Sequence, residues 1–445
     1  MALEFAHGAQ AWNSADAATT VYTISGLTFQ PKALMFFITG IASAVNAVNE
    51  TDSARVCIGF ATSTSDRRCQ GFLSVDNAGS ADTQEIYRAD AVLATVSAAA
   101  AVDGLLDLNS ITSDGFTLIV DDAAPVNLTV FWFAWGGDDI ENAATGEITE
   151  PAATGVQSYN VTNWLASVLG NNVVMFAGCK LTAAAPTAAV ADAGFMFGAA
   201  SATGAGNQFV DATNEDEGSA TMDTDTYIRG DECLAMIVDA GGNPNARVGF
   251  NGFDSTGFDL NWTARAVTNR RYIYLAIQGG SWTVGNIVYD SLTVGNTQSV
   301  PLTYPPKGAL HVNAQTRPED TAGTSSVTSA LGIGCWSSTS SRRAMGHLSR
   351  NGAGNAEIQT IIRYDAVQAS ASGGVGNGIG ALIDINAVGS ASFEIIVDDA
   401  GGSATAFAGF VSFGDAPRPS AIFPDYTARE RKIGVSGMRP PNQVN

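Results

Sequence analysis

Short motifs of this chain recur at one constant spacing. Pro31-Lys32 returns as Pro306-Lys307, Gly59 as Gly334, and Arg67-Arg68 as Arg342-Arg343. A constant spacing over so many positions indicates two copies of one folded unit, because chance similarity does not keep register. A third, more diverged copy lies between them. The arginine and aspartate pairs that mark the three copies are Arg88 and Asp90, Arg229 and Asp231, and Arg363 and Asp365.

The repeats predict three domains, which nearly exhaust the chain. They cover residues 1–137, 138–280 and 281–414, here called segments 1, 2 and 3, and residues 415–445 follow as an arm. Segment 2 is the diverged copy. Each segment is long enough to bury a core of its own. We therefore expect three independent domains in a row rather than a solenoid of short repeats.

Short apolar runs between Gly, Asn, Asp and Ser clusters are typical of an all-β fold. We predict three tandem jelly-roll-like β-sandwiches. The run Phe131–Trp135 is apolar at every position. It fits a central strand covered on both sides, or a strand with one face in the core and one against a neighbour. The Ala-rich stretch Thr182–Val190 is expected to be a loop. The strands predicted in segment 1 cover residues 33–39, 55–60, 83–92, 117–120 and 128–135.

The composition is acidic but poor in charge. The formal net charge is −21, and charged residues make up only 15% of the chain. An acidic surface repels phosphate-rich partners, which argues against nucleic acid and anionic membranes. The amino terminus has no basic region followed by an apolar core, and no long apolar run appears, so we expect neither a secretory signal nor membrane insertion. Synthesis and assembly in a cytoplasm are expected.

Five cysteines are an odd number for a disulfide framework, and none belongs to a Cys-x-x-Cys or Cys/His cluster. We expect buried, reduced cysteines that pack as small apolar residues. No cofactor and no metal are predicted. The cysteines are Cys57, Cys69, Cys179, Cys233 and Cys335.

The Arg-x-Asp element is present in all three copies. Residues two apart in a strand share a face, so each pair is expected to lie on one side of a strand. A functional interpretation is one ligand or contact site per segment. The interpretation we favour is a structural ion pair at the edge of the sandwich, because three retained copies suit a fold-determining role better than catalysis.

The Arg-Arg pairs, Arg67-Arg68 and Arg342-Arg343, follow turns rich in Ser and Thr. Segment 2 has Gly204–Asn207 in that region instead. Loss of the pair from one copy argues against a purely architectural role. The exposed arginines are expected to dock a carboxylate, a sugar acid or an acidic neighbouring subunit. The alternative, solvated loop charges, stays open.

Two acidic pairs, Asp121-Asp122 and Asp398-Asp399, follow predicted strands. Paired carboxylates can bind calcium, but six or more oxygen ligands are needed. Capping and solubilising a turn is the favoured interpretation. Segment 2 has Asn261–Ala264 at the equivalent place, which weakens the calcium hypothesis further.

The case for catalysis is poor. The only histidines are His7, His311 and His347, and none recurs between copies. The sequence has no nucleophile elbow, zinc-protease motif or phosphate-binding glycine loop. We therefore expect a protein that is not an enzyme, although two carboxylates would suffice for a glycosidase.

The arm is proline-rich and contains the basic residues Arg429, Arg431 and Lys432. Such a segment cannot form a core and should be extended. We expect it to lie on a partner chain or to fold back over its own domains.

Several phrases resemble tandem β-repeat structural proteins of tailed bacteriophages. They are Gly26–Phe37, with its GFQPKA-like opening, Gly59–Ala61, Asp114–Phe116 and Tyr274–Ala276. The resemblance covers residues from about 10 to 414 and is clearest in segments 1 and 3. It implies a virion structural component and carries over no catalytic residue. Segment 2 lacks the Pro-Lys step, so its partner surface is expected to differ.

Three functional hypotheses follow. The first is a non-enzymatic protein of the virion exterior, in the tail, baseplate or fibre, that serves host attachment or subunit linkage. The second is a capsid decoration protein. The third is a carbohydrate-binding or carbohydrate-cleaving module, which exposed Trp282, Trp336 and Tyr289 would favour. Expected partners are other virion proteins, further copies of the chain and a host-surface glycan.

Overall fold

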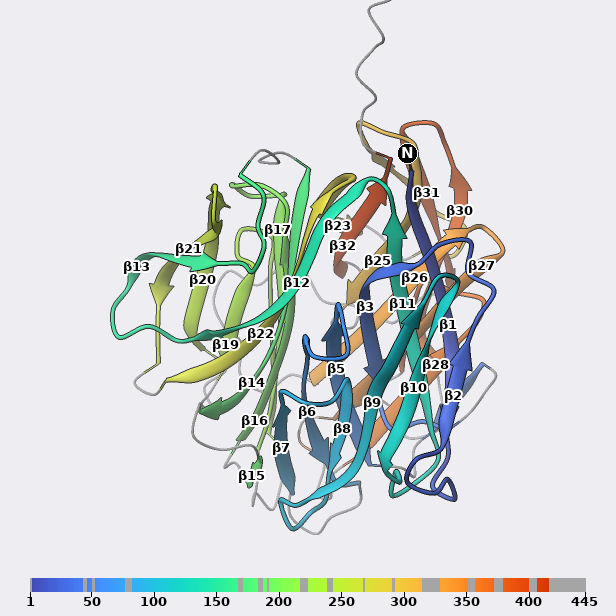
Figure 1. Ribbon diagram of the computed structural model, residues 1–445, viewed down its shortest axis with the longest axis vertical. Helices are drawn as coiled ribbons and strands as arrows, with labels where there is room; N and C mark the ends of the chain where they lie inside the picture. The colour runs from blue at the N-terminus through green and yellow to red at the C-terminus, as the bar shows by residue number, and fades with distance from the viewer. Residues whose placement is uncertain are drawn as a thin grey trace, which may run out of the picture.

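The computed structural model describes residues 2–42, 46–49, 53–76, 82–166, 171–182, 187–189, 192–216, 223–237, 243–266, 269–289, 293–313, 329–350, 352, 357–371, 379–399 and 406–415. Within these ranges every regular element is a β-strand, and the strands pair in antiparallel sheets (Figure 1). The predicted all-β fold is confirmed. Among the described residues, no helix has the length and apolar character that crossing a membrane requires.

Each predicted segment contributes strands to one large and one small sheet. The strands of segment 1 are β1 (Leu3–Trp12), β2 (Val21–Ile24), β3 (Pro31–Ile38), β4 (Ala47–Asn49), β5 (Ala54–Ala61), β6 (Arg67–Ser74), β7 (Thr83–Arg88), β8 (Leu93–Val96), β9 (Val102–Thr112), β10 (Gly115–Asp122) and β11 (Leu128–Gly137). Those of segment 2 are β12 (Ile140–Thr149), β13 (Gly155–Asn160), β14 (Asn172–Thr182), β15 (Thr187–Ala189), β16 (Asp192–Ala200), β17 (Gln208–Asp216), β18 (Thr224–Arg229), β19 (Leu234–Ile237), β20 (Pro244–Phe253), β21 (Gly257–Ala264) and β22 (Arg270–Gly279). Those of segment 3 are β23 (Ser281–Tyr289), β24 (Thr297–Pro301), β25 (Pro306–Asn313), β26 (Ser329–Ser338), β27 (Ser341–Ser349), β28 (Ile358–Arg363), β29 (Gln368–Ala371), β30 (Ile379–Val388), β31 (Ser392–Asp399) and β32 (Ala406–Gly414).

The strand order is the same in all three segments. The large sheets run β1-β11-β3-β5-β6-β7, β12-β22-β14-β16-β17-β18 and β23-β32-β25-β26-β27-β28. The small sheets run β2-β10-β9-β8, β13-β21-β20-β19 and β24-β31-β30-β29. The strand predicted over 83–92 ends earlier, at Arg88. The chain leaves the large sheet after Arg88 and enters the small sheet at Leu93.

The recurring glycine of the large sheet has a steric cause. A Cβ atom at Gly59 would lie 1.6 Å from the carbonyl oxygen of Val92, at the point where the two sheets meet. At Gly334 it would lie 2.0 Å from the Val367 carbonyl oxygen. Real Cβ atoms do not approach backbone so closely, so only glycine fits at these positions.

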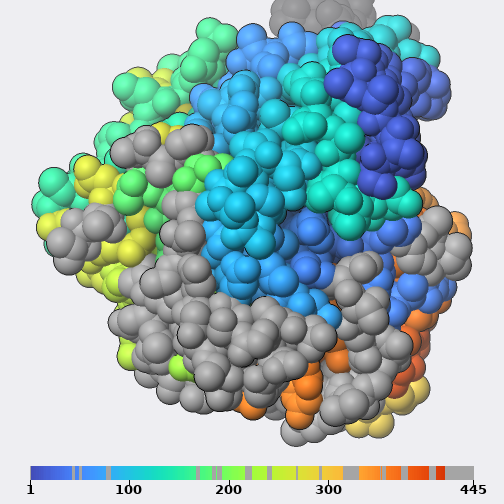
Figure 2. Space-filling view, turned by 90° about the horizontal axis from the view of Figure 1, so that it is seen from below, coloured from blue at the N-terminus to red at the C-terminus, as the bar shows by residue number. Residues whose placement is uncertain are grey.

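The three large sheets pack against one another and share one core. Phe131, Phe133 and Trp135 of β11 project into this core, where they join residues of β14, β22 and β32. Val130 and Trp132, on the other face of β11, belong to the sandwich core of segment 1. The expected row of independent domains is therefore wrong. The segments close into a ring around a pseudo-three-fold axis, and occupy different sides of the molecule when it is seen from below (Figure 2).

Short strands also pass from one segment to another. β15 of segment 2 pairs with β7 of segment 1, and β4 of segment 1 pairs with β28 of segment 3. β15 lies in the stretch expected to be a loop, and it is strand because a neighbouring sheet edge supplies its partner. Both exchanges extend the large sheet of the preceding segment in the ring. The corresponding stretch of segment 3, 314–328, lies outside the described residues.

Because the central core is shared, we predict that Phe133→Ala destabilises all three segments together. Phe133 is fully buried, and removal of its ring should lower the free energy of unfolding by about 3–5 kcal/mol. Calorimetry and circular dichroism should show one transition that moves to lower temperature as a whole. Val156→Ala is the control, because Val156 is 51% exposed. Separate transitions, with only one shifted, would contradict a shared core.

Candidate functional site

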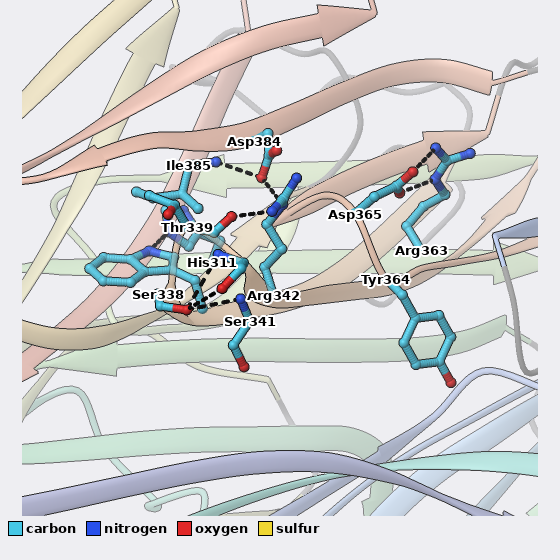
Figure 3. Close-up of polar contacts among 12 residues, drawn as sticks. His311, Ser338, Thr339, Ser341, Arg342, Arg363, Tyr364, Asp365, Asp384 and Ile385 are labelled. Atoms are coloured by element: carbon cyan, nitrogen blue, oxygen red, sulfur yellow. Dashed lines mark hydrogen bonds and ion pairs between the residues drawn. The ribbon is translucent and has the colours of Figure 1, made fainter.

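The three Arg-x-Asp elements form equivalent ion pairs. In each, the arginine Nε donates to Oδ1 of the aspartate and Nη2 donates to Oδ2, at 2.5–2.8 Å. Mutual hydrogen bonding raises the pKa of Arg88 and lowers that of Asp90. The expected placement on one strand face is wrong, because each arginine ends its strand and the aspartate lies in the following bend. The pairs thus hold the turn between the large and small sheets. Figure 3 shows the pair formed by Arg363 and Asp365.

The first arginine of each Arg-Arg pair links the two sheets of its own sandwich. Arg67 donates to both carboxylate oxygens of Asp107 on β9, with Nη2 at 2.6 Å from Oδ2. Arg342 bonds Asp384 on β30 at 2.5 Å (Figure 3). Burial raises the pKa of Asp384 to about 6, although the Ile385 N–H and Arg342 oppose the shift. We had expected these two arginines to dock a partner. Their guanidinium groups are instead bound to aspartates of the same sandwich.

Segment 2 replaces this ion pair with a neutral equivalent. Val210 pairs with Arg229 in the same way that Cys69 pairs with Arg88, so Val210 is the counterpart of Cys69. Two residues earlier, Gln208 is therefore the counterpart of Arg67. The stretch Gly204–Asn207, which the sequence comparison had placed there, is not. The strand register likewise puts Gly249 at the position of Asp107. The Asp107 carboxylate accepts the N–H of Leu108, and in segment 2 Gln208 Oε1 accepts the corresponding N–H of Phe250 at 2.7 Å. The absence of the arginine pair in segment 2 is therefore a compensated change.

The second arginine of each pair faces the next segment around the ring. The Arg343 guanidinium carbon lies 5.5 Å from the ring centres of Phe131 in segment 1 and of Tyr364. Burial lowers the pKa of Arg343. Arg68 lies near Tyr274 of segment 2, where its positive charge opposes the burial that raises the tyrosine pKa to about 12. Both side chains are partly buried at seams between segments.

The turn before each Arg-Arg pair binds the first strand of the next segment. Asp66 accepts the N–H of Thr145 at 2.9 Å and its hydroxyl at 2.6 Å. At the seam that closes the ring, His7 of β1 lies 3.2 Å from the carbonyl oxygen of Ser341. The pairing register makes His7 and Thr145 equivalent.

The Pro-Lys motif also serves the seams. Lys32 donates to the carbonyl oxygen of Ile140 at 2.7 Å, at the start of segment 2. Lys307 donates to the carbonyl oxygen of Leu3 at 2.6 Å, and also forms an ion pair with Asp415 at 2.8 Å. The motif recurs because both lysines fasten the first strand of the following segment.

Buried ionisable side chains also lie at the seams, and the sequence alone did not predict them. His347 of segment 3 lies 3.2 Å from Oε1 of Glu215 in segment 2. Burial alone would raise the pKa of Glu215, but the hydrogen bond and charge of His347 outweigh it and lower the pKa. Glu85 of segment 1 accepts the N–H of Gly194 in segment 2 at 2.9 Å, and burial raises its pKa to about 7. The one signal in the sequence is a charged residue within an apolar strand.

The histidines have no general-base geometry. Burial and the charge of Arg343 lower the pKa of His7 to about 3. Nε2 of His7 faces the Ser341 carbonyl, which can only accept, so Nε2 carries the ring proton and cannot take one from the nearby Ser341 hydroxyl. Nε2 of His311 accepts from Trp336 Nε1 at 3.0 Å, and burial lowers the His311 pKa to about 3. Both rings are neutral packing residues.

The remaining candidates give no ligand site in the described residues. No group of three or more His, Cys, Asp or Glu side chains there is placed to hold a metal ion, and Asp121 and Asp122 are exposed at the end of β10. All five cysteines are free and buried. Arg429, Arg431 and Lys432 lie outside the described residues. Trp282, Trp336 and Tyr289 are buried, so they offer no platform for a sugar.

Hollows in the surface are open and polar. One, of about 650 Å³, is lined by Tyr289, Gly295–Gln298, Ile395 and Val397. A second, of about 490 Å³, follows the seam between segments 1 and 2 beside Lys32 and Glu141. The seams themselves are the candidate functional feature, because several of the retained polar residues, namely Lys32, Lys307 and Arg343, make their contacts there.

We predict that the neutral pair of segment 2 can replace the ion pair of segment 1. Arg67→Ala should lower the free energy of unfolding by about 2 kcal/mol, because it leaves the Asp107 carboxylate without its charged partner. The double change Arg67→Gln with Asp107→Gly should cost clearly less. Urea unfolding of both variants gives the comparison. A double variant as unstable as Arg67→Ala would contradict the compensation.

We predict that Glu85→Gln changes how stability depends on pH. The carboxyl titrates near 4.5 when unfolded and about 7 when folded, so its penalty on folding is absent below 4.5 and fully present above 7. The glutamine variant should therefore gain stability over the parent as pH rises from 5 to 8, by on the order of 3 kcal/mol. Urea unfolding at both pH values measures this. Glu141→Gln, at an exposed position of β12, is the control, and an equal gain in both variants would contradict the assignment.

No protein-family model matches the chain, and no curated protein matches it in sequence. The likeness to tandem repeat proteins of tailed bacteriophages therefore stays an expectation drawn from short motifs. What the protein does must be inferred from the geometry of the ring.

Proposed function

We propose that this chain is a non-enzymatic structural protein of a bacteriophage virion exterior. We further propose that it acts as a single-chain pseudo-trimer bound at a local three-fold position of the capsid. The observation that carries the proposal is the ring itself, in which one chain places three similar sandwiches around one axis. A partner lattice with three-fold symmetry can offer the same contact to each segment.

The ring favours the decoration hypothesis over a tail fibre or baseplate spike. A trimeric fibre needs an apolar face on each chain to bury against two other chains. Here the apolar faces of the large sheets are already buried against one another. Among the described residues, the large apolar side chains that stay exposed are scattered. They are Val21, Val156, Leu165, Val288, Val294 and Val388.

The use of the retained polar residues supports a structural role. Lys32, Arg67 and Asp66 are bound within a sandwich or across a seam. Because these side chains are engaged in contacts within the ring, partner contacts would be made by loops and by the largely uncharged Ser/Thr surface. The carbohydrate hypothesis depended on exposed Trp282, Trp336 and Tyr289, and these side chains are buried.

Light scattering and immunogold electron microscopy test the proposal. We predict that the purified chain is a monomer of 45.8 kDa. An antibody raised against it should label the heads of phage particles. A stable trimer of chains with label on the tail would replace decoration by the tail hypothesis. Particles without label would overturn a virion role altogether.

A further inference from the structure

A polar row crosses the large sheet of segment 2. Gly194 of β16 pairs with Asn214 of β17, which in turn pairs with Asp225 of β18. Lys180, near the end of β14, reaches over Gly194 toward Asn214, because a Cβ atom at Gly194 would lie only 2.7 Å from its Cε. The strand register places leucines, Leu73 and Leu348, at the position of Asn214 in the other segments.

The row brings an amine, a carboxamide and a carboxyl group together. Nζ of Lys180 lies 2.6 Å from Oδ1 of Asn214, and Nδ2 of Asn214 donates to Oδ2 of Asp225 at 3.5 Å. Asn214 and Asp225 are fully buried, while Lys180 is partly buried. The lysine amine is thus beside the oxygen of the Asn214 carboxamide, and the Asp225 carboxylate is beside its nitrogen.

We propose that Lys180 and Asn214 form an intramolecular isopeptide bond, with Asp225 as the proton carrier. Nζ loses a proton to the Asp225 carboxylate and attacks Cγ of Asn214 with its lone pair. The bond from Cγ to Nδ2 then breaks, and Asp225 returns the proton to the departing nitrogen. The former Nζ, now bonded to Cγ, releases its second proton to solvent at the partly buried end of Lys180. One carbon–nitrogen bond forms and one breaks, and the ammonium and carboxamide become a secondary amide, ammonia and one proton. The step requires no oxidant and no cofactor.

Folding supplies the conditions for this reaction. The sheet holds the amine beside the amide, which replaces an encounter in solution by a contact within one molecule. Burial of Asn214 and Asp225 excludes the water that would otherwise hydrolyse the amide or solvate the carboxylate. The product would tie β14 to β17 across β16, so the cross-link would strengthen the segment that lacks the arginine–aspartate ion pair found between the sheets of segments 1 and 3.

The intact mass of the purified full chain, measured after denaturation, tests the proposal. The expected mass is lower than that of the Lys180→Arg variant by one ammonia molecule, after allowance for the substitution itself. A tryptic digest should contain a branched peptide that joins the two strands, with no cleavage after Lys180. A parent mass that shows no loss of ammonia would overturn the proposal, and this result does not depend on any variant folding.

Two further variants separate the roles of the residues. Asp225→Asn should keep the contact but leave the bond unformed, and full cross-linking in that variant would overturn the role of Asp225. Lys32→Arg is the matched control, because Lys32 contacts a backbone carbonyl rather than an amide side chain. It should retain the ammonia loss. Loss of the cross-link in this control would show that a distant seam and not the row governs the reaction, which contradicts the proposal.

Discussion

Each large sheet of this protein is apolar on both faces, and burial of the second face shapes the rest of the molecule. The small sheet of each sandwich covers one face. The other face, represented by Phe133 in β11, Leu275 in β22 and Val411 in β32, is covered only when three large sheets meet. A single segment alone would expose this surface to water, at roughly 25 cal/mol for each Å². The ring is therefore part of the fold and not a later association of finished domains.

The retained polar residues follow from that constraint. A ring of three needs each seam to be set in position, and directional bonds do this where apolar packing does not. Lys32 fastens the first strand of segment 2, and Lys307 fastens the first strand of segment 1, which follows segment 3 in the ring. Asp66 binds the backbone of Thr145. Buried carboxylates at the seams add specificity at an energetic cost, as the raised pKa of Glu85 indicates.

Segment 2 departs most from the common pattern, and its departures are paired. Gln208 with Gly249 performs the task of Arg67 with Asp107, since a backbone N–H of the small sheet is satisfied in both. The exchange removes two charges together, so no buried charge is left alone. Divergence of this copy is therefore compatible with an unchanged architecture, and the polar row that includes Lys180 is where segment 2 differs in chemistry as well.

Sequence periodicity and repeats were sufficient to predict the all-β class and most strands, because alternation and turn residues are local properties. They also predicted that Phe131–Trp135 is covered on both sides. The sequence could not tell that the covering partner is another segment, since a second apolar face looks the same whichever surface buries it. Nor could it tell that Arg67 binds Asp107 while Arg68 faces the next segment. Those assignments depend on strand order and on which edge each sheet presents, and only long-range packing decides both.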